Sequence, residues 1–198
     1  MILIFSFRNS DGIEDICIPR VINNLNLCFN PGALIPDKVS ELTGLNNELL
    51  KQQSRFSQST GIVLKSFLDH LTPPVCLVAH NGDRYDYPLL KAELECVGHD
   101  DLGPDVHVVD SLQSLRKIFD EPEVKKKLNF DKPNSFSLPK LHEHIFGNKP
   151  KTSHGSEVDV MALIRVCAFI AEAFVKYAEC HSSSFKCAKK MGMLEPGK

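Results

Sequence analysis

Two polar segments of the sequence carry side chains that could bind a metal ion and activate a water molecule. In the first, an apolar run ends at Ala79, and Asp86 follows where a helical pattern begins. In the second, His154 precedes Asp159 at the start of a long amphipathic pattern. A histidine can act as a general base towards water, and aspartate oxygens are ligands for hard metal ions. Asp86 and Asp159 are therefore candidate metal ligands, and His154 is a candidate general base.

Each of these acidic residues also has a purely structural explanation. Asp86 stands where a helix is expected to begin, and an aspartate at that place can cap free backbone N–H groups. Asp159, together with Glu157, could merely complement the positive N-terminal end of its helix. Taken singly, neither segment establishes a reaction, so the interpretation depends on their order and combination.

The elements that must position these side chains alternate between strands and helices. Strands are predicted at residues 1–7, 21–29, 75–79 and 106–109. The first two would form an antiparallel pair, and helical spacing of apolar residues predicts helices between the later strands and a long helix over 156–178. This alternation predicts an α/β fold, with a mixed sheet that carries helices on both faces. Ligands of such sheets bind at the carboxyl ends of the strands, where Asp86 is expected to lie.

Composition fits one globular domain and excludes several classes of protein. The chain has 198 residues, of which 42% are apolar, and a formal net charge of −2. We assign residues 1–180 to one domain and residues 181–198 to a polar C-terminal tail. A strongly basic coat for nucleic acid is excluded by the net charge, whereas a local basic groove is not, because net charge averages over all faces.

Cysteine usage and hydropathy indicate the compartment. The seven cysteines are scattered and contain no C-x-x-C pair, which argues against a structural zinc site and favours reduced thiols. No apolar stretch reaches the ~18 residues that a membrane span needs. The apolar start at residues 1–7 is too short for the core of a signal peptide. We therefore expect a soluble cytoplasmic or nuclear protein without membrane association.

Taken together, the polar segments and their order resemble the DEDDh 3′→5′ exonucleases, and most of all the three prime repair exonuclease family. The resemblance extends from about Val21 to Lys176, and its most specific part runs from Ala79 to Asp86. The matching segments are Leu25–Cys28, Ser40–Leu45, Cys76–Asp86, Val109–Ser111, Ser135–Leu138 and Ser153–Val160. This resemblance implies a ribonuclease-H-like exonuclease fold.

The resemblance also implies a reaction and its catalytic residues. It implies a metal-dependent 3′→5′ exodeoxyribonuclease that removes nucleotides from the 3′ ends of single-stranded or mismatched DNA, an activity of DNA repair. Asp86 and Asp159 would bind metal, and His154 would deprotonate the attacking water. Two Mg²⁺ ions would stabilise the attacking water and the leaving 3′ oxygen.

Substrate contacts and an oligomeric state follow from the same resemblance. Leu42 would press on the 3′-terminal base, and Arg84 and Tyr85 would lie near the bound single strand. The family forms a homodimer by joining edge strands through main-chain hydrogen bonds. Leu25–Phe29 is the matching strand here, so a homodimer through this strand is a hypothesis.

One motif of the family is not found in this sequence. The family's first motif is an apolar strand with Asp-x-Glu, and no Asp-x-Glu occurs in residues 1–198. Because two carboxylates neutralise two metal ions poorly, we expect weak Mg²⁺ binding and a nearly inactive chain. The strand of that motif is central in the family's sheet. We therefore also expect strands 1–7 and 75–79 to lack a neighbour, which would leave backbone groups unpaired.

Three interpretations follow from the resemblance and the missing motif. The first is a 3′→5′ exodeoxyribonuclease whose first segment lies outside this sequence. The second is a non-catalytic relative that keeps single-strand binding or dimerisation, which the absent Asp-x-Glu favours. The third is an exoribonuclease of the same superfamily, which the context of Arg84, Tyr85 and Asp86 disfavours.

Overall fold

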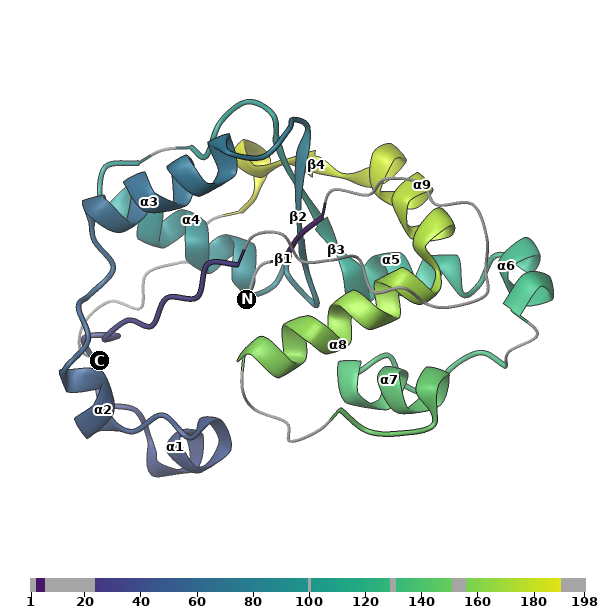
Figure 1. Ribbon diagram of the computed structural model, residues 1–198, viewed down its shortest axis with the longest axis horizontal. Coiled ribbons are helices and arrows are strands. Elements are labelled where there is room, and N and C mark those ends of the chain that lie inside the picture. Colours follow the sequence, from purple (N-terminus) through teal and green to yellow (C-terminus); the bar gives the residue numbers. More distant parts are fainter. Residues whose placement is uncertain (1–2, 6–23, 100, 129–130, 151–155, 190–198) are drawn as a thin grey trace.

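A mixed four-stranded sheet lies between two groups of helices in the computed structural model, which describes residues 3–5, 24–99, 101–128, 131–150 and 156–189 (Figure 1). The strands, in their order across the sheet, are β1 (Leu3–Phe5), β2 (Val75–Ala79), β3 (Val106–Asp110) and β4 (Ser183–Ser184). β2 and β3 are parallel, whereas β1 pairs with β2 and β4 pairs with β3 in antiparallel fashion. The predicted α/β fold with a mixed sheet is confirmed.

The helices occupy the connections between the strands. They are α1 (Asp37–Thr43), α2 (Asn47–Lys51), α3 (Gln58–Asp69), α4 (Asp86–Cys96), α5 (Ser111–Ile118), α6 (Pro122–Leu128), α7 (Leu138–Phe146), α8 (Ser156–Phe169), α9 (Ala171–His181) and the 3₁₀ helix η1 (Phe185–Cys187). Within the described part of the chain, none of these helices combines the length and apolarity that crossing a membrane requires.

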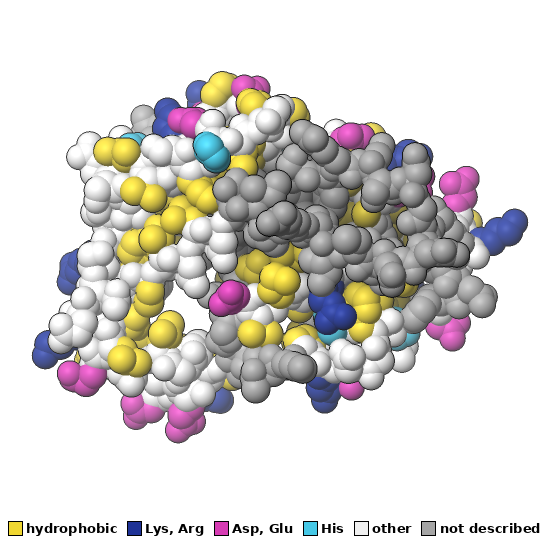
Figure 2. All heavy atoms as spheres, in the orientation of Figure 1, with side chains coloured by type: hydrophobic (Ala, Val, Ile, Leu, Met, Phe, Trp, Pro, Cys, Tyr) yellow, Lys and Arg dark blue, Asp and Glu magenta, His cyan; other side chains and the backbone are white. Residues whose placement is uncertain are grey.

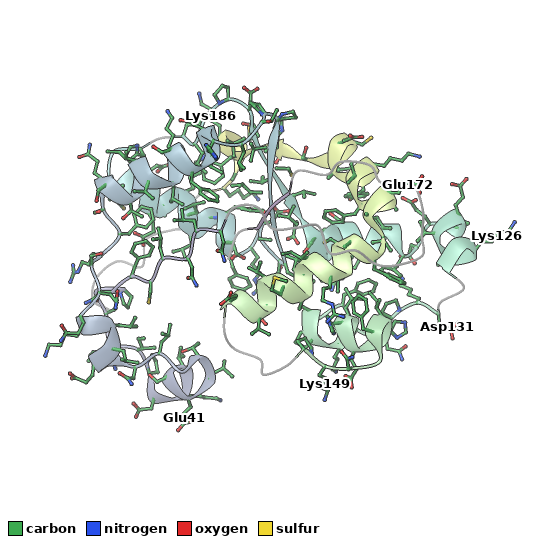
Figure 3. All side chains as sticks on the ribbon, in the orientation of Figure 1. Glu41, Lys126, Asp131, Lys149, Glu172 and Lys186 are labelled. Carbon is green, nitrogen blue, oxygen red and sulfur yellow. The ribbon has the colours of Figure 1, made fainter. Side chains whose placement is uncertain are left out.

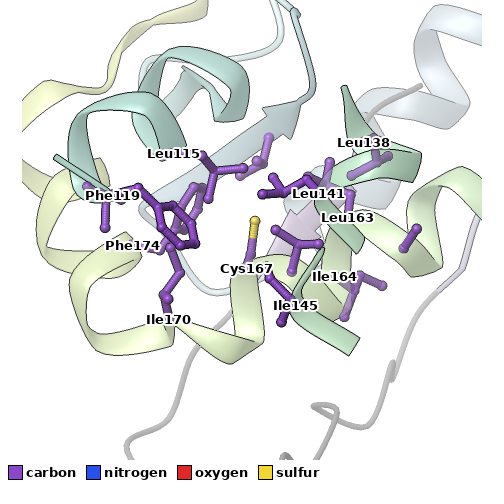
Figure 4. Packing of buried hydrophobic residues seen from close by; sticks show 14 of the residues in the cluster. Leu115, Phe119, Leu138, Leu141, Ile145, Leu163, Ile164, Cys167, Ile170 and Phe174 are labelled. Carbon is purple, nitrogen blue, oxygen red and sulfur yellow. The ribbon is translucent and has the colours of Figure 1, made fainter. Parts of the chain in front are cut away.

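Side chains of β2 and β3 alternate between two buried clusters, one on each face of the sheet. Val78 and Val109 belong to a cluster with α5, α7, α8 and α9, in which Leu115, Cys167 and Phe174 also pack (Figure 4). Leu77 and Val108 belong to a second cluster, formed with α3, α4 and η1. Because both faces are covered, both strands are apolar almost throughout. The predicted helices on both faces are confirmed.

β1 supplies β2 with a neighbour on the side away from β3. Leu3 lies opposite Val78, and Phe5 lies opposite Cys76. The expectation that strand 75–79 would lack a partner on this side is therefore wrong for the described residues. The antiparallel pairing provides the N–H and C=O partners that a bare edge would have left unsatisfied.

The strand predicted at residues 21–29 is not present in its described part. Residues 24–30 form neither strand nor helix, and residues 21–23 lie outside the described residues. The ring of Phe29 packs on Phe56 at a centroid distance of 5.3 Å, and the N–H of Asn30 donates to the carbonyl of Ser54. These contacts tie the segment to the connection between α2 and α3 instead of to a sheet. The hypothesis of a homodimer through Leu25–Phe29 thus lacks its strand.

The single long helix predicted over 156–178 is two helices. Ile170 separates α8 from α9, with φ of −122° and ψ of 36°, outside the helical range. Its side chain is buried in the same cluster as Cys167 and Phe174. The change of direction allows residues of both helices to reach this cluster, so tertiary packing overrides the continuous helical pattern of the sequence.

The domain continues past residue 180, where the sequence analysis ended it. β4 pairs with β3, and Phe185 is fully buried in the cluster on the α4 side. The ammonium group of Lys91, on α4, donates to the carbonyls of Lys186 and Ala188 at 2.5 and 2.8 Å. The boundary predicted between residues 180 and 181 is therefore wrong. The described chain packs on the domain as far as Ala188.

Truncation of the buried core should destabilise the fold far more than truncation of an exposed leucine. Leu115 is fully buried, whereas Leu34 is 86% exposed. We expect Leu115→Ala to lower the free energy of unfolding by about 2–5 kcal/mol, because it leaves a cavity between α5 and the sheet. The matched control, Leu34→Ala, should change it by less than about 0.5 kcal/mol. Urea unfolding followed by circular dichroism measures both, and equal effects would contradict the assignment of this core.

Candidate active site

The candidate site begins at the carboxyl ends of β2 and β3, which lie side by side because the strands are parallel. Ala79, the last residue of β2, is paired with Asp110, the last residue of β3. From Ala79 the chain enters the turn 80–85 and then α4, whereas from Asp110 it enters α5 directly. Polar side chains at the two exits can therefore bond across from one connection to the other.

The carboxylate of Asp110 joins the two connections. It is 5% exposed and accepts three backbone N–H groups. Leu112, in the first turn of α5, donates at 2.8 Å, while Asn81 and Asp83, in the turn after β2, donate at 3.0 and 3.2 Å. Asn81 has a φ of 63°, in the left-handed region that asparagine adopts more readily than most residues. Burial raises the pKa of Asp83, and the nearby charge of Asp110 raises it further.

The ring of His80 connects the same turn to the segment that precedes α7. Its Nε2 lies 2.9 Å from the carbonyl oxygen of Phe136, and its Nδ1 lies 3.1 Å from the hydroxyl of Ser111. Because a carbonyl only accepts, Nε2 donates to Phe136. The Ser111 hydroxyl lies 3.2 Å from the carbonyl oxygen of Ala79, to which it donates, so its one proton is shared between that carbonyl and Nδ1 of a neutral ring. Burial lowers the pKa of His80, although the Phe136 carbonyl and the Asp110 carboxylate oppose this shift. The environment thus favours the neutral ring.

Tyr87 supports the turn from the interior. Its hydroxyl lies 2.9 Å from the carbonyl oxygen of Leu77 and 2.7 Å from that of Val109, so it bridges β2 and β3. Gly82 lies against the ring, and a Cβ atom at residue 82 would be 2.6 Å from Cε2 of Tyr87. The turn can therefore approach the ring this closely only because residue 82 has no side chain.

An open cavity of about 830 Å³ lies between this turn, α5 and the segment that leads into α7. It is lined by His80, Asn81, Tyr85, Leu112, Arg116 and residues 132–138. Arg116 and Lys132 contribute positive charge and Tyr85 and Phe136 contribute rings, whereas the described lining contains no Asp or Glu. Lys132 lies 2.7 and 2.9 Å from the carboxylate oxygens of Asp120. Among the described residues Arg116 has no such carboxylate partner, so it offers this cavity more positive charge than Lys132 does.

One of the predicted site residues, Tyr85, lines the cavity. Arg84 is exposed, and its guanidinium carbon lies 5.2 Å from the centroid of the Tyr85 ring. Asp86 is half-buried at the first position of α4, and its charge acts on the His80 ring. The turn therefore brings Arg84, Tyr85 and Asp86 to the edge of the sheet where the cavity lies.

The remaining predicted residues are Asp159, His154 and Leu42, none of which is among the described residues that line the cavity. Asp159 is half-buried in the first turn of α8, and His154 is outside the described residues. Leu42 is 53% exposed on α1, which Figure 1 shows at the lower left, away from β2 and β3. The structure thus does not bring Leu42 to the cavity, and the convergence of Asp86, His154 and Asp159 stays a prediction.

Leu42 belongs to a group of exposed apolar side chains on and beside α1 and α2. The group consists of Leu34, Val39, Leu42, Leu45 and Leu49. Figure 2 shows hydrophobic side chains on the visible surface at the lower left, where Figure 1 places these two helices. Because α1 has no buried residue, its position is set mainly by its connections, such as the two hydrogen bonds between Asn47 and Ile35.

The described residues provide part of what a metal site requires. Asp86 and Asp159 offer carboxylate oxygens, which are the ligands that Mg²⁺ prefers. Within the described ranges, no three or more His, Cys, Asp or Glu side chains are grouped so that they could hold a metal ion. The described part of the chain therefore does not by itself form the two-ion site that the resemblance implies.

Sequence reasoning gave no role to Asp110, His80 or Arg116. An aspartate between a buried strand and an amphipathic helix is typical of a helix cap. The cap that Asp110 forms on α5 could therefore have been predicted from the sequence. The bonds from Asp110 to Asn81 and Asp83 depend on the register of β2 against β3, which the sequence does not contain.

Comparison with known proteins places this site in a family. The sequence profile of the exonuclease family matches residues 11–167. The chain is 36% identical over 178 residues to Three-prime repair exonuclease 1 of Bos taurus, which covers 89% of this chain and 56% of that protein. It is 33% identical over 171 residues to Three prime repair exonuclease 2 of Mus musculus, covering 85% and 71%.

The Homo sapiens relative named Three-prime repair exonuclease 1 is 34% identical over 174 residues, covering 87% of this chain and 54% of that protein. The chain therefore spans little more than half the length of the two relatives named Three-prime repair exonuclease 1. The profile match includes both connections that form the candidate site, the turn after β2 and the start of α5. The chain belongs to the exonuclease family, in the DEDDh group that includes the three-prime repair exonucleases.

Proposed function

We propose that this protein is a metal-dependent 3′→5′ exodeoxyribonuclease that removes nucleotides from the 3′ ends of single-stranded or mismatched DNA. The observation that carries the proposal is the cavity beside the turn into α4, lined by cationic and aromatic side chains, in a member of the exonuclease family. The names of the relatives, three-prime repair exonucleases, support the direction of digestion and the role in repair.

The cavity offers the groups that a single strand of DNA requires. The Arg116 guanidinium suits a backbone phosphate, and the rings of Tyr85 and Phe136 suit the faces of bases. Stacking and phosphate contacts do not distinguish base sequence, which fits an enzyme that removes any terminal nucleotide. The absence of acidic side chains from the described lining avoids repulsion of the phosphates.

We assign the chemical roles to residues at the starts of two helices. Asp86 opens α4 beside the cavity-lining Tyr85, and Asp159 lies in the first turn of α8. In this proposal both carboxylates are Mg²⁺ ligands, and His154 takes the proton of the attacking water. Mg²⁺, when bound, would supply charge stabilisation to the phosphate that is cleaved.

A second candidate function is a non-catalytic relative that binds single-stranded nucleic acid or dimerises. Two observations favour it: no Asp-x-Glu occurs in residues 1–198, and the described residues contain no cluster able to hold a metal ion. Such a relative would still bind nucleic acid in the cavity through Arg116 but would not hydrolyse it. The two functions therefore differ in one measurable property, the release of nucleotides.

The first experiment measures that release. We expect the 198-residue chain to bind a 3′-labelled single-stranded oligonucleotide with Mg²⁺ present but to release little label. A form with an Asp-x-Glu strand joined ahead of residue 1 should release terminal nucleotides, because it adds the missing carboxylates. In that form Asp159→Asn should lower the rate on the order of 10²-fold, since a charge that stabilises the reacting phosphate is lost.

The outcomes separate the two candidates. Robust release by the 198-residue chain, abolished by Asp159→Asn, would show that the site is complete without the first motif. Binding without release in both forms would support the non-catalytic relative. Absence of binding in both forms, with a normal melting transition, would contradict the exonuclease and the relative that binds single-stranded nucleic acid, and would leave only the relative that dimerises.

The second experiment tests the cavity as the binding surface. We expect Arg116→Ala to weaken binding of single-stranded DNA about tenfold and to reduce the slope of log K against log salt by about 0.7, because one phosphate contact is lost. The matched control is Lys186→Ala, an exposed cation at the top edge of the molecule (Figure 3). Fluorescence anisotropy at several salt concentrations measures both quantities. Equal weakening by the two substitutions would indicate nonspecific attraction and not a cavity contact.

A further inference from the structure

We propose that Asp110 is a positioning residue of this site. Its carboxylate fixes the position of the turn 80–85 through two hydrogen bonds. The turn, held in this position, places Tyr85 on the cavity wall and Asp86 at the start of α4. The importance of Tyr85 and Asp86 rests on the proposed function. The position of the turn itself does not depend on that function.

The hydrogen bonds of Asp110 extend beyond what a helix cap needs. A cap on α5 requires only the bond from the N–H of Leu112. The other two bonds come from Asn81 and Asp83, which lie 29 and 27 residues earlier in the chain. These two bonds link the segment after β2 to the end of β3. Two of the three hydrogen bonds that the carboxylate accepts therefore come from the turn.

Apart from Asp110, the middle of the turn is held by Gly82, which lies against the Tyr87 ring and whose carbonyl accepts from the N–H of Tyr87 at 3.0 Å. Tyr85, the residue before α4, makes no side-chain cap on the helix, and its φ of −126° and ψ of −64° lie outside the helical range. Within the turn, the N–H of Arg84 donates to Asn81 over a long 3.3 Å. Asn81 is also in the left-handed region, which costs free energy for a residue with a side chain, although asparagine tolerates it better than most. The bond from its N–H to Asp110 helps to offset this cost.

A second link confirms that the turn is attached to the start of α5. His80, the first residue of the turn, contacts the hydroxyl of Ser111, the residue after Asp110. Both attachments therefore lead to one short segment at the end of β3. A displacement of that segment would move the turn, and Tyr85 and Asp86 would move with it.

The two oxygens of Asp110 have different partners, which makes a sharp test possible. Oδ1 accepts from Asn81 and Leu112, whereas Oδ2 accepts from Asp83. In Asp110→Asn the amide oxygen should take the Oδ1 place, because that orientation keeps two bonds. Its NH₂ group then faces the N–H of Asp83, and two donors cannot bond. This variant removes the turn bond at Asp83 and leaves the helix cap in place.

The experiment compares amide exchange and DNA binding in the 198-residue chain. For Asp110→Asn we expect hydrogen exchange at the Asp83 amide, measured by NMR, to accelerate about tenfold, as for one lost hydrogen bond. Exchange at the Leu112 amide should stay slow. Affinity for a fluorescein-labelled oligothymidylate should fall about fivefold, because Tyr85 loses its fixed place on the cavity wall.

Asp110→Ser is the matched second variant. A serine keeps an acceptor for the cap on α5 but is too short to reach both N–H groups of the turn. We expect fast exchange at Asn81 and Asp83 and weak DNA binding in a protein that still melts cooperatively. If Asp110 were only a helix cap, this variant would bind DNA as the unaltered chain does.

Unchanged exchange at Asp83 in Asp110→Asn would overturn the proposal, and so would a loosened turn with unchanged DNA affinity. If the unaltered chain binds no oligothymidylate, the proposed function fails, and exchange at Asn81 and Asp83 then decides the role of Asp110 by itself. Should Asp110→Asn not fold, the same two measurements on Asp110→Ser decide between a positioning residue and a helix cap.

Discussion

The parallel, in-register pairing of β2 with β3 is the constraint on which the rest of the structure depends. It sets Ala79 opposite Asp110, so that the chain leaves both strands at one edge of the sheet. A slip of one residue would exchange the buried faces and turn Asp110 away from the neighbouring turn. The two clusters prevent this slip, since Val78 and Val109 face one set of helices while Leu77 and Val108 face the other.

This pairing also separates the charges of the site. The Asp110 carboxylate is enclosed by backbone N–H groups, and the ring of His80 is held between a hydroxyl and a carbonyl. Arg116, one and a half turns into α5, instead faces the open cavity. The negative charge of Asp110 is therefore stabilised by hydrogen bonds in the interior, while the positive charge of Arg116 faces the open cavity. A chain with a formal net charge of −2 can thus carry a cationic cavity.

Local signals predicted the central part of the fold well, and long-range contacts account for what they missed. The run 75–79 is buried on both faces, so its apolar composition alone predicted β2. The helix expected to begin at Asp86 is α4, although Tyr85 and not Asp86 is its N-cap residue. Residues 24–29 alternate like a strand, but this described segment forms no strand, and Phe29 instead packs on Phe56. The break at Ile170 comes from packing against the core, and the attachment of the turn to Asp110 comes from strand register. Neither of these leaves a local pattern in the sequence.

The shortness of β4 has a consequence for association between chains. Two serines, Ser183 and Ser184, cover the outer side of β3, and the chain then turns inward so that Phe185 is buried. A strand of two small polar residues offers another molecule almost no backbone to pair with, which is one way in which proteins suppress edge-to-edge aggregation. Lys91 keeps this short cover in place through the carbonyls of Lys186 and Ala188. A neutral side chain at position 91 would lose both bonds, and a loosened β4 would expose the edge of β3 to pairing with another chain.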